Sequence, residues 1–204
     1  MTMQISLPEF RRGYQAFQTH EARDAMYKIA NFVVSQFWGR PADMADGLGV
    51  LLLTWNQAFY RYGSFDFDLL EHVIQANLAT IQDYHNRDIV TLGTPDEPLI
   101  KHLFEQFLDA LQIADGKMKG RKSPVAVAKA LHLLNPGFFS LWDDRIAREY
   151  DCHYAHQPAE KYVTFSYKMK EIAKQIGANV SCGNKTILKL IDEYNYAKFT
   201  KEWI

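Results

Sequence analysis

Apolar side chains recur every three or four residues along most of the chain, which is the spacing of amphipathic helices. Strict alternation of apolar and polar residues, the pattern of a half-buried strand, is nearly absent, and residues 88–92 and 162–165 are its only weak occurrences. The sequence therefore predicts an all-α protein. The predicted helices cover residues 21–37, 69–81, 95–114, 124–134, 143–150, 158–177 and 184–194.

Capping signals indicate where several of these helices begin. Asp66 or Asp68 can cap the helix that follows, because a carboxylate accepts hydrogen bonds from the free amides of a first turn. Residues 94–97, Thr-Pro-Asp-Glu, place a capping Thr, a Pro at the first helical position and a Glu three residues after the cap. Ser123 followed by Pro124 is a second start signal of this kind.

Two further expectations concern single segments. Pro41 opens a helical segment that we expect to break near Gly47 and Gly49 and to resume as a very apolar run over residues 50–62. The helix over residues 95–114 should turn one apolar face inward. The inward residues of that face are Leu99, Leu103, Phe104, Phe107, Leu108 and Leu111.

The chain has the length and composition of one globular domain. Its 204 residues are 48% apolar and 23% charged, which excludes a disordered chain, a collagen-like repeat and a disulfide scaffold. No apolar run exceeds four residues, so we expect no membrane span. The first 12 residues lack the apolar core of a secretory signal, and there are only two cysteines. We therefore expect a cytoplasmic protein with reduced thiols, and a monomer.

The net charge of −1 hides a difference between the two halves of the chain. Residues 1–115 carry 8 Lys and Arg against 15 Asp and Glu, and residues 116–204 carry 15 against 9. We expect these halves to form two lobes of the single domain, with a polyanion as the partner of the basic half. Pairing of the two halves with each other is the alternative. The lysines of the second half that we expect to face solvent are Lys161, Lys168, Lys170, Lys174, Lys185 and Lys189.

The most informative segment is basic and glycine-rich, and it leads into a helix. Four of the six residues from 117 to 122 are Lys or Arg, and Gly116 and Gly120 let the backbone turn tightly. The free amides at the following helix start attract anions. We interpret the segment as a phosphate clamp, with a solvated interhelical loop as the alternative. The residues expected to contact phosphate are Lys117, Lys119, Gly120, Arg121 and Ser123.

The helix and turn that follow place a lysine and two aspartates in an apolar setting. Residues 125–134 are apolar nearly all round, so Lys129 must either reach the surface with its ammonium or meet a carboxylate. Asp143 and Asp144 come after an aromatic run at residues 138–142. Either aspartate can cap a helix, and alternatively one of them projects into a cleft.

Together these elements resemble the helix-hairpin-helix family of base-excision DNA glycosylases, which carries Gly-x-Lys at the end of a hairpin and a catalytic Asp further along. Gly120-Arg121-Lys122 matches the first element, and residues 141–146 match the segment around the Asp, with Lys122 and Asp143 21 residues apart. Two cysteines cannot hold the family's four-cysteine iron–sulfur cluster. The resemblance is therefore to the branch without the cluster, similar to 8-oxoguanine glycosylases. It implies a central helix-hairpin-helix element over residues 115–135.

The resemblance also implies an enzyme that flips a modified or damaged base out of double-stranded DNA and cleaves its N-glycosidic bond without a cofactor. A carboxylate stabilises the sugar cation, and Asp143 is the first choice for this role, with Asp144 second. If a Lys amine also attacks the sugar and cleaves the strand, Lys122 is the first choice and Lys129 the competitor. Which base is removed, and whether the role is repair or defence against foreign DNA, stays open.

A pocket for the flipped base needs aromatic faces and an amide. Trp55, Asn56 and Tyr60 supply both within the very apolar segment, and Asn56 and Tyr60 share one helix face. Trp55 also belongs to an aromatic stripe with Phe59 and Tyr62, and such stripes usually pack in a core.

Other classes of function stay open. One is a helix-hairpin-helix module that binds nucleic acid without catalysis, and another is a helical interaction or regulatory protein with a protein partner. A metal site is not expected, because the spacing of Cys152, His153, His156 and Cys182 fits no zinc pattern.

Overall fold

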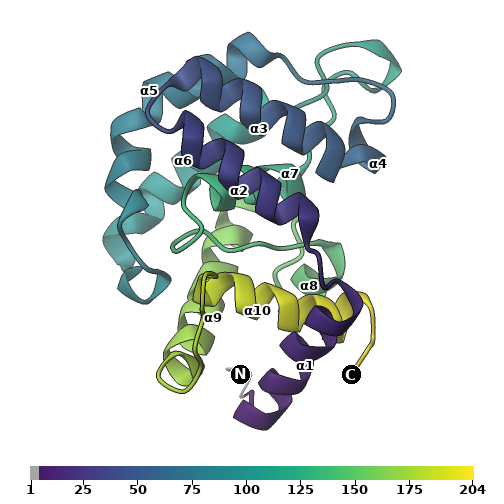
Figure 1. Ribbon diagram of the computed structural model, residues 1–204. Helices are drawn as coiled ribbons and strands as arrows, with labels where there is room; N and C mark the ends of the chain where they lie inside the picture. Colours follow the sequence, from purple (N-terminus) through teal and green to yellow (C-terminus); the bar gives the residue numbers. More distant parts are fainter. Residues whose placement is uncertain (1–4) are drawn as a thin grey trace.

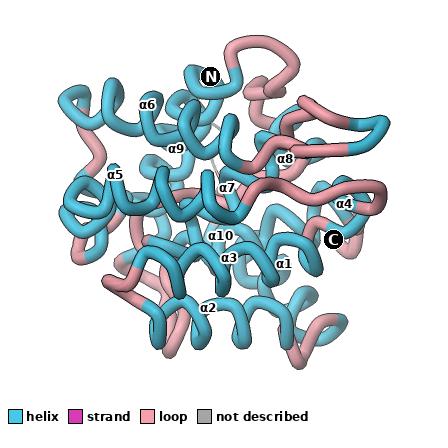
Figure 2. The backbone as a smooth tube through the Cα atoms, turned by 90° about the horizontal axis from the view of Figure 1, so that it is seen from above, coloured by secondary structure: helices cyan, strands magenta, loops and turns pink. Residues whose placement is uncertain are grey.

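The computed structural model describes residues 5–204 as a set of packed helices (Figure 1, Figure 2). No strand occurs in this range, so the all-α prediction is confirmed. Short 3₁₀ turns, η1 to η3, cover Ile89–Thr91, Thr94–Asp96 and Gly116–Met118, and η4, a π-helix, covers Tyr196–Thr200. The α-helices are α1 (Leu7–His20), α2 (Ala25–Phe37), α3 (Pro41–Trp55), α4 (Gln57–Tyr60), α5 (Phe67–His85), α6 (Glu97–Ala110), α7 (Pro124–Leu134), α8 (Asp144–Glu149), α9 (Pro158–Gly177) and α10 (Ile187–Asn195).

Two of the three predicted capping signals are confirmed, whereas Thr94 is not a cap, because it lies inside η2 and α6 begins only at Glu97. Asp66 caps α5, where its Oδ1 accepts the backbone N–H groups of Asp68 and Leu69 at 3.0 and 3.1 Å. Ser123 caps α7 through the backbone N–H of Ala126. The predicted range 158–177 is that of α9. A cap depends on residues that are adjacent in sequence, so packing elsewhere in the protein does not change where these helices begin.

The expected break within residues 41–62 is wrong in its position, because α3 runs through Gly47 and Gly49 without interruption. A Cβ at Gly47 would lie 2.9 Å from the ring of Phe37, and one at Gly49 would lie 2.2 Å from the ring of Phe67. These glycines allow neighbouring aromatic rings to approach the helix. The helix ends at Trp55 instead, and the short helix α4 follows it.

The helix predicted over residues 95–114 is shorter at both ends, and one of its expected inward residues, Leu99, lies at the surface. α6 ends at Ala110, since the backbone of residue 113 hydrogen-bonds with residues 120 and 121 across the loop and leaves the helical path. Leu99 is 47% exposed because the first turn of α6 lies at the surface. At the start signal, the carboxylate of Asp96 accepts the backbone N–H of Gly93 at 2.8 Å. Both weak strand candidates are helical, one in η1 and the other inside α9.

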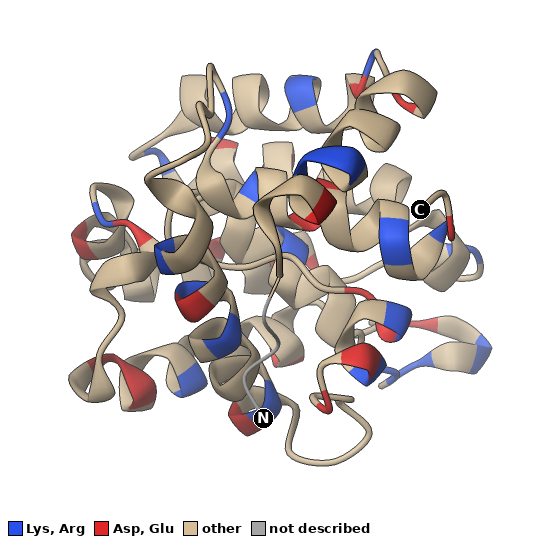
Figure 3. Cartoon of the chain, turned by 90° about the horizontal axis from the view of Figure 1, so that it is seen from below, with Lys and Arg blue, Asp and Glu red and all other residues tan. Residues whose placement is uncertain are grey.

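The first helix, which apolar periodicity did not reveal, packs on the last one. α1 contacts α10 and η4, α6 contacts α9, and α3 lies between α2 and α5 (Figure 1). One connected core of buried residues reaches from Ile5 to Tyr194. The acidic first half and the basic second half of the sequence are thus in contact, and basic and acidic segments alternate across the side of the molecule seen in Figure 3.

Within the described residues no helix is both long and apolar enough to cross a membrane. Residues 1–4, which open the stretch expected to lack a secretory signal, lie outside the described range.

The close approach of α1 and α10 leads to a stability prediction. A Cβ at Gly13 would lie 2.4 Å from Cδ2 of Tyr194, whose side chain is fully buried. We expect Gly13→Ala to destabilise the protein by about 1–3 kcal/mol through overpacking, although Ala is the better helix former. The measurement is urea unfolding followed by circular dichroism.

The matched control is Gly177→Ala at the end of α9, where a Cβ meets nothing within 4 Å. This variant should be as stable as the parent or slightly more stable. Equal stability of the two variants would contradict the close packing of α1 on α10.

Candidate functional site

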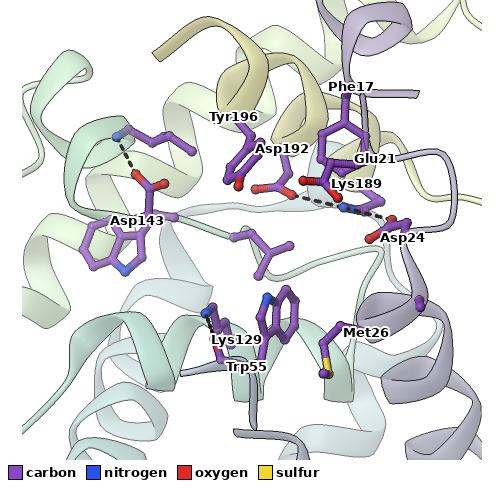
Figure 4. A pocket seen from close by; sticks show the side chains of 14 residues that line it. Phe17, Glu21, Asp24, Met26, Trp55, Lys129, Asp143, Lys189, Asp192 and Tyr196 are labelled. Carbon is purple, nitrogen blue, oxygen red and sulfur yellow. Dashed lines mark hydrogen bonds and ion pairs between the residues drawn. The ribbon is translucent and has the colours of Figure 1, made fainter. Parts of the chain in front are cut away.

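A cavity of about 290 Å³ lies where both ends of the chain meet its middle. Its walls come from the α1–α2 turn, the end of α3, α7, the start of α8 and α10 (Figure 4). This volume is near the lower end of the range for ligand pockets, roughly 300 to 1,000 Å³. The polar side chains that line it are Glu21, Asp24, Lys129, Asp143, Lys189 and Asp192, and the aromatic ones are Phe17, Trp55, Trp142 and Tyr196.

Lys129 presents an amine of reduced basicity to this cavity. Burial lowers the pKa of Lys129 to about 8, although the negative charges of Asp192 and Asp143 act in the opposite direction. Its Nζ donates a hydrogen bond to the carbonyl oxygen of Trp55 at 3.0 Å and lies 4.7 Å from the centre of the Trp55 ring. A large fraction of this amine is therefore uncharged around pH 8.

Asp143 is held at the start of α8 through both of its carboxylate oxygens. Oδ1 accepts the backbone N–H of Ile146 at 2.8 Å, so Asp143 is the N-cap of the helix. Oδ2 accepts the hydroxyl of Thr200, in the π-helix η4, at 2.7 Å. Arg145 donates to the carbonyl oxygen of Thr200 at 3.1 Å. The sequence left open whether this aspartate is a cap or projects into a cleft. The structure shows the cap, and the residue also belongs to the lining of the cavity.

Across the cavity from Lys129, a buried ammonium is surrounded by carboxylates (Figure 4). Lys189 Nζ lies 3.4 Å from Asp24 Oδ2 and 3.3 Å from Asp192 Oδ2, and Glu193 Oε1 is 3.7 Å away. Burial by itself would lower the pKa of Lys189, but the three carboxylates outweigh it and raise this pKa. Burial also raises the pKa values of Asp192 and Glu193, against the attraction of the Lys189 ammonium.

Three of the predicted site residues lie together around the cavity, namely Lys129, Asp143 and Trp55. Asn56 and Tyr60, expected to form one face of a base pocket, are not part of its lining. The Asn56 amide donates to the hydroxyl that caps α7, at 3.1 Å. The Tyr60 hydroxyl is buried and donates to a backbone carbonyl at 2.8 Å.

Lys122 and Asp144 also lie away from the cavity. Lys122 is exposed and forms an ion pair with Asp109. Asp144 is exposed, and its carboxylate lies 2.9 Å from Nε of Arg148 and 3.0 Å from Nε2 of His153. The hydrogen bond from Arg148 lowers the pKa of Asp144. Of the two candidate lysines and two candidate aspartates, the structure brings Lys129 and Asp143 to one cavity.

The basic loop between α6 and α7 projects into solvent, and its base adjoins the cavity wall. Four of its predicted phosphate contacts are exposed, whereas the Ser123 hydroxyl is buried in the cap of α7. Asn56, next to Trp55, donates to this hydroxyl, and Trp142 Nε1 donates to the carbonyl oxygen of Pro124 at 3.2 Å. The exposed residues of the loop are Lys117, Lys119, Gly120 and Arg121.

The residues of the opposite wall were missed by the sequence analysis. Lys189 was expected to face solvent but is 2% exposed, because its ammonium lies 4.7 and 4.5 Å from the ring centres of Phe17 and Tyr27 and meets carboxylates. Lys189 and Asp192 are three residues apart on α10, a spacing that could have suggested an ion pair. No local signal points to Asp24, which comes from the other end of the chain.

The histidines and cysteines do not add a metal centre to the described part of the chain. No group of three His, Cys, Asp or Glu side chains is placed there to hold a metal ion. Cys152 is a buried free thiol and Cys182 a half-buried one.

The lowered pKa of Lys129 predicts a specific pH dependence of stability. Between the native pKa of about 8 and the ordinary value of 10.5, the folded protein binds fewer protons than the unfolded chain, so stability rises with pH in this window. Below pH 8 the buried ammonium costs about 3 kcal/mol. We therefore expect Lys129→Met to be more stable than the parent at pH 7 by an amount of this order. The gain should disappear as the pH approaches 10.5.

Urea unfolding at several pH values is the measurement, with Lys117→Met as the control. Lys117 is exposed, so its replacement should leave the pH dependence of stability unchanged. A gain in Lys129→Met that is the same at every pH would show that Lys129 has an ordinary pKa.

No protein-family model, curated protein or solved structure matches this chain. The function is therefore inferred from the side chains that line the cavity.

Proposed function

We propose that the protein is a DNA glycosylase that flips a modified or damaged base out of duplex DNA and cleaves its N-glycosidic bond, with Lys129 and Asp143 as the reacting residues. The observation that carries this proposal is the presence of a buried amine with a pKa of about 8 and a fixed carboxylate around one cavity. The resemblance of the segment from Gly120 to Ile146 to the helix-hairpin-helix glycosylases supports the same chemistry.

The amine of Lys129 has the properties of a nucleophile. When it is uncharged, one N–H donates to the carbonyl oxygen of Trp55 and the lone pair remains free. This lone pair forms a bond to C1′ of the flipped nucleotide while the electron pair of the C1′–N bond leaves with the base. One proton of the attacking amine goes to the departing base, and the second goes to O4′ as the C1′–O4′ bond opens. The product is an imine between Lys129 and C1′, which is the intermediate of strand cleavage.

Asp143 supplies negative charge next to the same carbon. The C1′–N bond breaks through a sugar cation, and a fixed carboxylate stabilises this cation because it needs no reorientation. The amide of Ile146 and the hydroxyl of Thr200 hold the carboxylate in place. If water rather than Lys129 attacks C1′, the same carboxylate orients it and accepts its proton.

The basic loop provides the surface for the DNA backbone. Lys117, Lys119 and Arg121 are exposed on a loop whose base is hydrogen-bonded to the neighbours of Trp55 and Asp143. Phosphates bound by this loop would therefore lie beside the wall of the cavity into which the base is flipped.

The first prediction of this mechanism concerns the lysine. On duplexes that contain modified bases, borohydride should trap a covalent protein–DNA adduct with the parent and with Lys122→Ala, but not with Lys129→Ala. Lys122 is the matched control because its ammonium is exposed and paired with Asp109. The adduct is measured by its reduced mobility in denaturing gels.

Several outcomes would contradict this assignment. Trapping that survives in Lys129→Ala and fails in Lys122→Ala would make Lys122 the nucleophile. Base release without any trapping by the parent would make water the nucleophile. Duplex binding with neither base release nor trapping would leave a nucleic-acid-binding module without catalysis.

The second prediction concerns the carboxylate. Asp143→Asn should slow base release by about 10²- to 10³-fold, because the charge that opposes the sugar cation is lost. Asn is as good an N-cap as Asp, so α8 and the affinity for duplex DNA should be kept. Base release is measured by strand scission in hot alkali, and DNA affinity by filter binding.

Asp144→Asn is the matched control and should release base at the parental rate, because its side chain faces Arg148 and His153. A normal rate in Asp143→Asn together with a slow rate in Asp144→Asn would reverse the roles of the two aspartates.

A further inference from the structure

Asp24 has a buried carboxylate oxygen that accepts no hydrogen bond. Oδ2 is closed off from solvent and lies 3.4 Å from Lys189 Nζ, in ionic contact but without a hydrogen bond, while the Asp24 residue belongs to the lining of the cavity. A buried polar atom is nearly always hydrogen-bonded in a native protein, because leaving it unpaired costs free energy. The other carboxylate oxygen, Oδ1, is not closed off in this way and accepts no hydrogen bond from the described residues, so it is the acceptor left for a donor that enters the cavity with a ligand.

The backbone of Asp24 is also held in an uncommon conformation. Its φ of 40° and ψ of 44° fall in the left-handed region, which residues other than Gly rarely adopt. Two hydrogen bonds fix it there, from its own N–H to the carbonyl of Glu21 at 3.0 Å and from the N–H of Lys28 to its carbonyl at 3.1 Å. The backbone of Asp24 is therefore fixed at the point where this residue joins the lining of the cavity.

The wall around Asp24 carries more negative than positive charge. Asp24 and Asp192 share the single ammonium of Lys189, and Glu21 adds a further carboxylate to the lining (Figure 4). Lys129, on the other side of the cavity, is uncharged in a large fraction of molecules around pH 8. The acidic wall therefore favours a ligand edge that donates hydrogen bonds and disfavours one that presents only acceptors.

We propose that Asp24, assisted by Asp192, recognises the hydrogen-bond donors on the edge of a nucleobase, so that the cavity selects bases with amino or imino N–H groups. This inference rests on the proposed function, since it assigns the class of base that the cavity accepts. Trp55 lies across the cavity and offers an aromatic face to such a base. A hydrogen bond to a buried carboxylate should favour a base with the donor by about 10- to 100-fold.

The test uses free bases, so that recognition is measured without catalysis. All bases are used as their 9-methyl derivatives, because the N9–H of a free purine is itself a hydrogen-bond donor that a nucleotide lacks. Binding of 2-aminopurine is followed by its own fluorescence, and adenine and unsubstituted purine compete with it. We expect 2-aminopurine and adenine, which carry an amino group, to bind the parent at least 10-fold more tightly than purine. In Asp24→Asn and Asp24→Gly this preference should fall to less than about threefold, because the anionic acceptor is lost.

The two variants keep the experiment interpretable. Asn and Gly both tolerate the left-handed backbone of position 24, so neither adds strain. Thermal unfolding of each variant shows whether the fold is intact, and at least one must be folded like the parent at the assay temperature. Asp46→Asn, at an exposed position of α3, is the matched control and should keep the full preference.

The outcomes separate this inference from the proposed function. The role of Asp24 is overturned if folded Asp24 variants keep the full preference. It is also overturned if the parent binds purine and 2-aminopurine equally, or if the parent shows no saturable binding of any base. Base release by a parent that fails this test leaves the glycosylase proposal in place. The parent can also bind bases in a way that depends on Asp24 and yet release no base from any duplex. This result supports the role of Asp24 in base recognition and overturns the glycosylase proposal.

Discussion

The buried ammonium of Lys189 is the interaction on which the cavity depends. Its side chain is 3% exposed and lies between carboxylates from α10 and from the α1–α2 turn. Removing one partner of such a buried pair typically costs about 3–5 kcal/mol, because the remaining charge is left uncompensated. Lys189 therefore connects the α1–α2 turn to α10, and it keeps the carboxylates of Asp24 and Asp192 close together despite their like charge.

Two buried lysines at the same cavity have pKa values that are shifted in opposite directions. Lys189 keeps its proton because three carboxylates surround it, whereas Lys129 has only a carbonyl oxygen and an aromatic face within direct contact, so its pKa falls to about 8. One amine is thereby fixed as a structural cation, and the other becomes available as a base or nucleophile. The difference comes from their neighbours and not from the residue type.

The sequence revealed the parts of the fold that depend on local signals. Ser123 and Asp66 cap helices where their spacing predicted, and α9 has the predicted bounds. α1 was not recognised, because only Phe10, Gly13 and Phe17 of its residues are buried and the glycine carries no hydrophobic signal. Gly49 looked like a helix breaker because the ring of Phe67, which explains it, is distant in the sequence.

The candidate site divides in the same way. Lys129 and Asp143 stood out because a lysine within an apolar helix and an aspartate after an aromatic run are unusual in their own sequence surroundings. Asp24, Asp192 and Thr200 are ordinary in theirs, and they become functional candidates only because folding brings both ends of the chain to α7 and α8. Contacts between residues that are far apart in the sequence cannot be predicted from periodicity or from the spacing of residues.

The ends of the chain therefore determine the geometry at Asp143. Thr200 donates to one of its oxygens from a π-helix, a distortion that recurs at functional sites, and Arg145 of α8 donates in turn to the Thr200 carbonyl. α8 and η4 thus hold each other through two hydrogen bonds of opposite direction. Because η4 continues α10, a shift of α10 would change the position of Lys189 and the orientation of the Asp143 carboxylate together. The acidic wall and the carboxylate that faces the sugar in the proposed reaction are consequently parts of one mechanical unit.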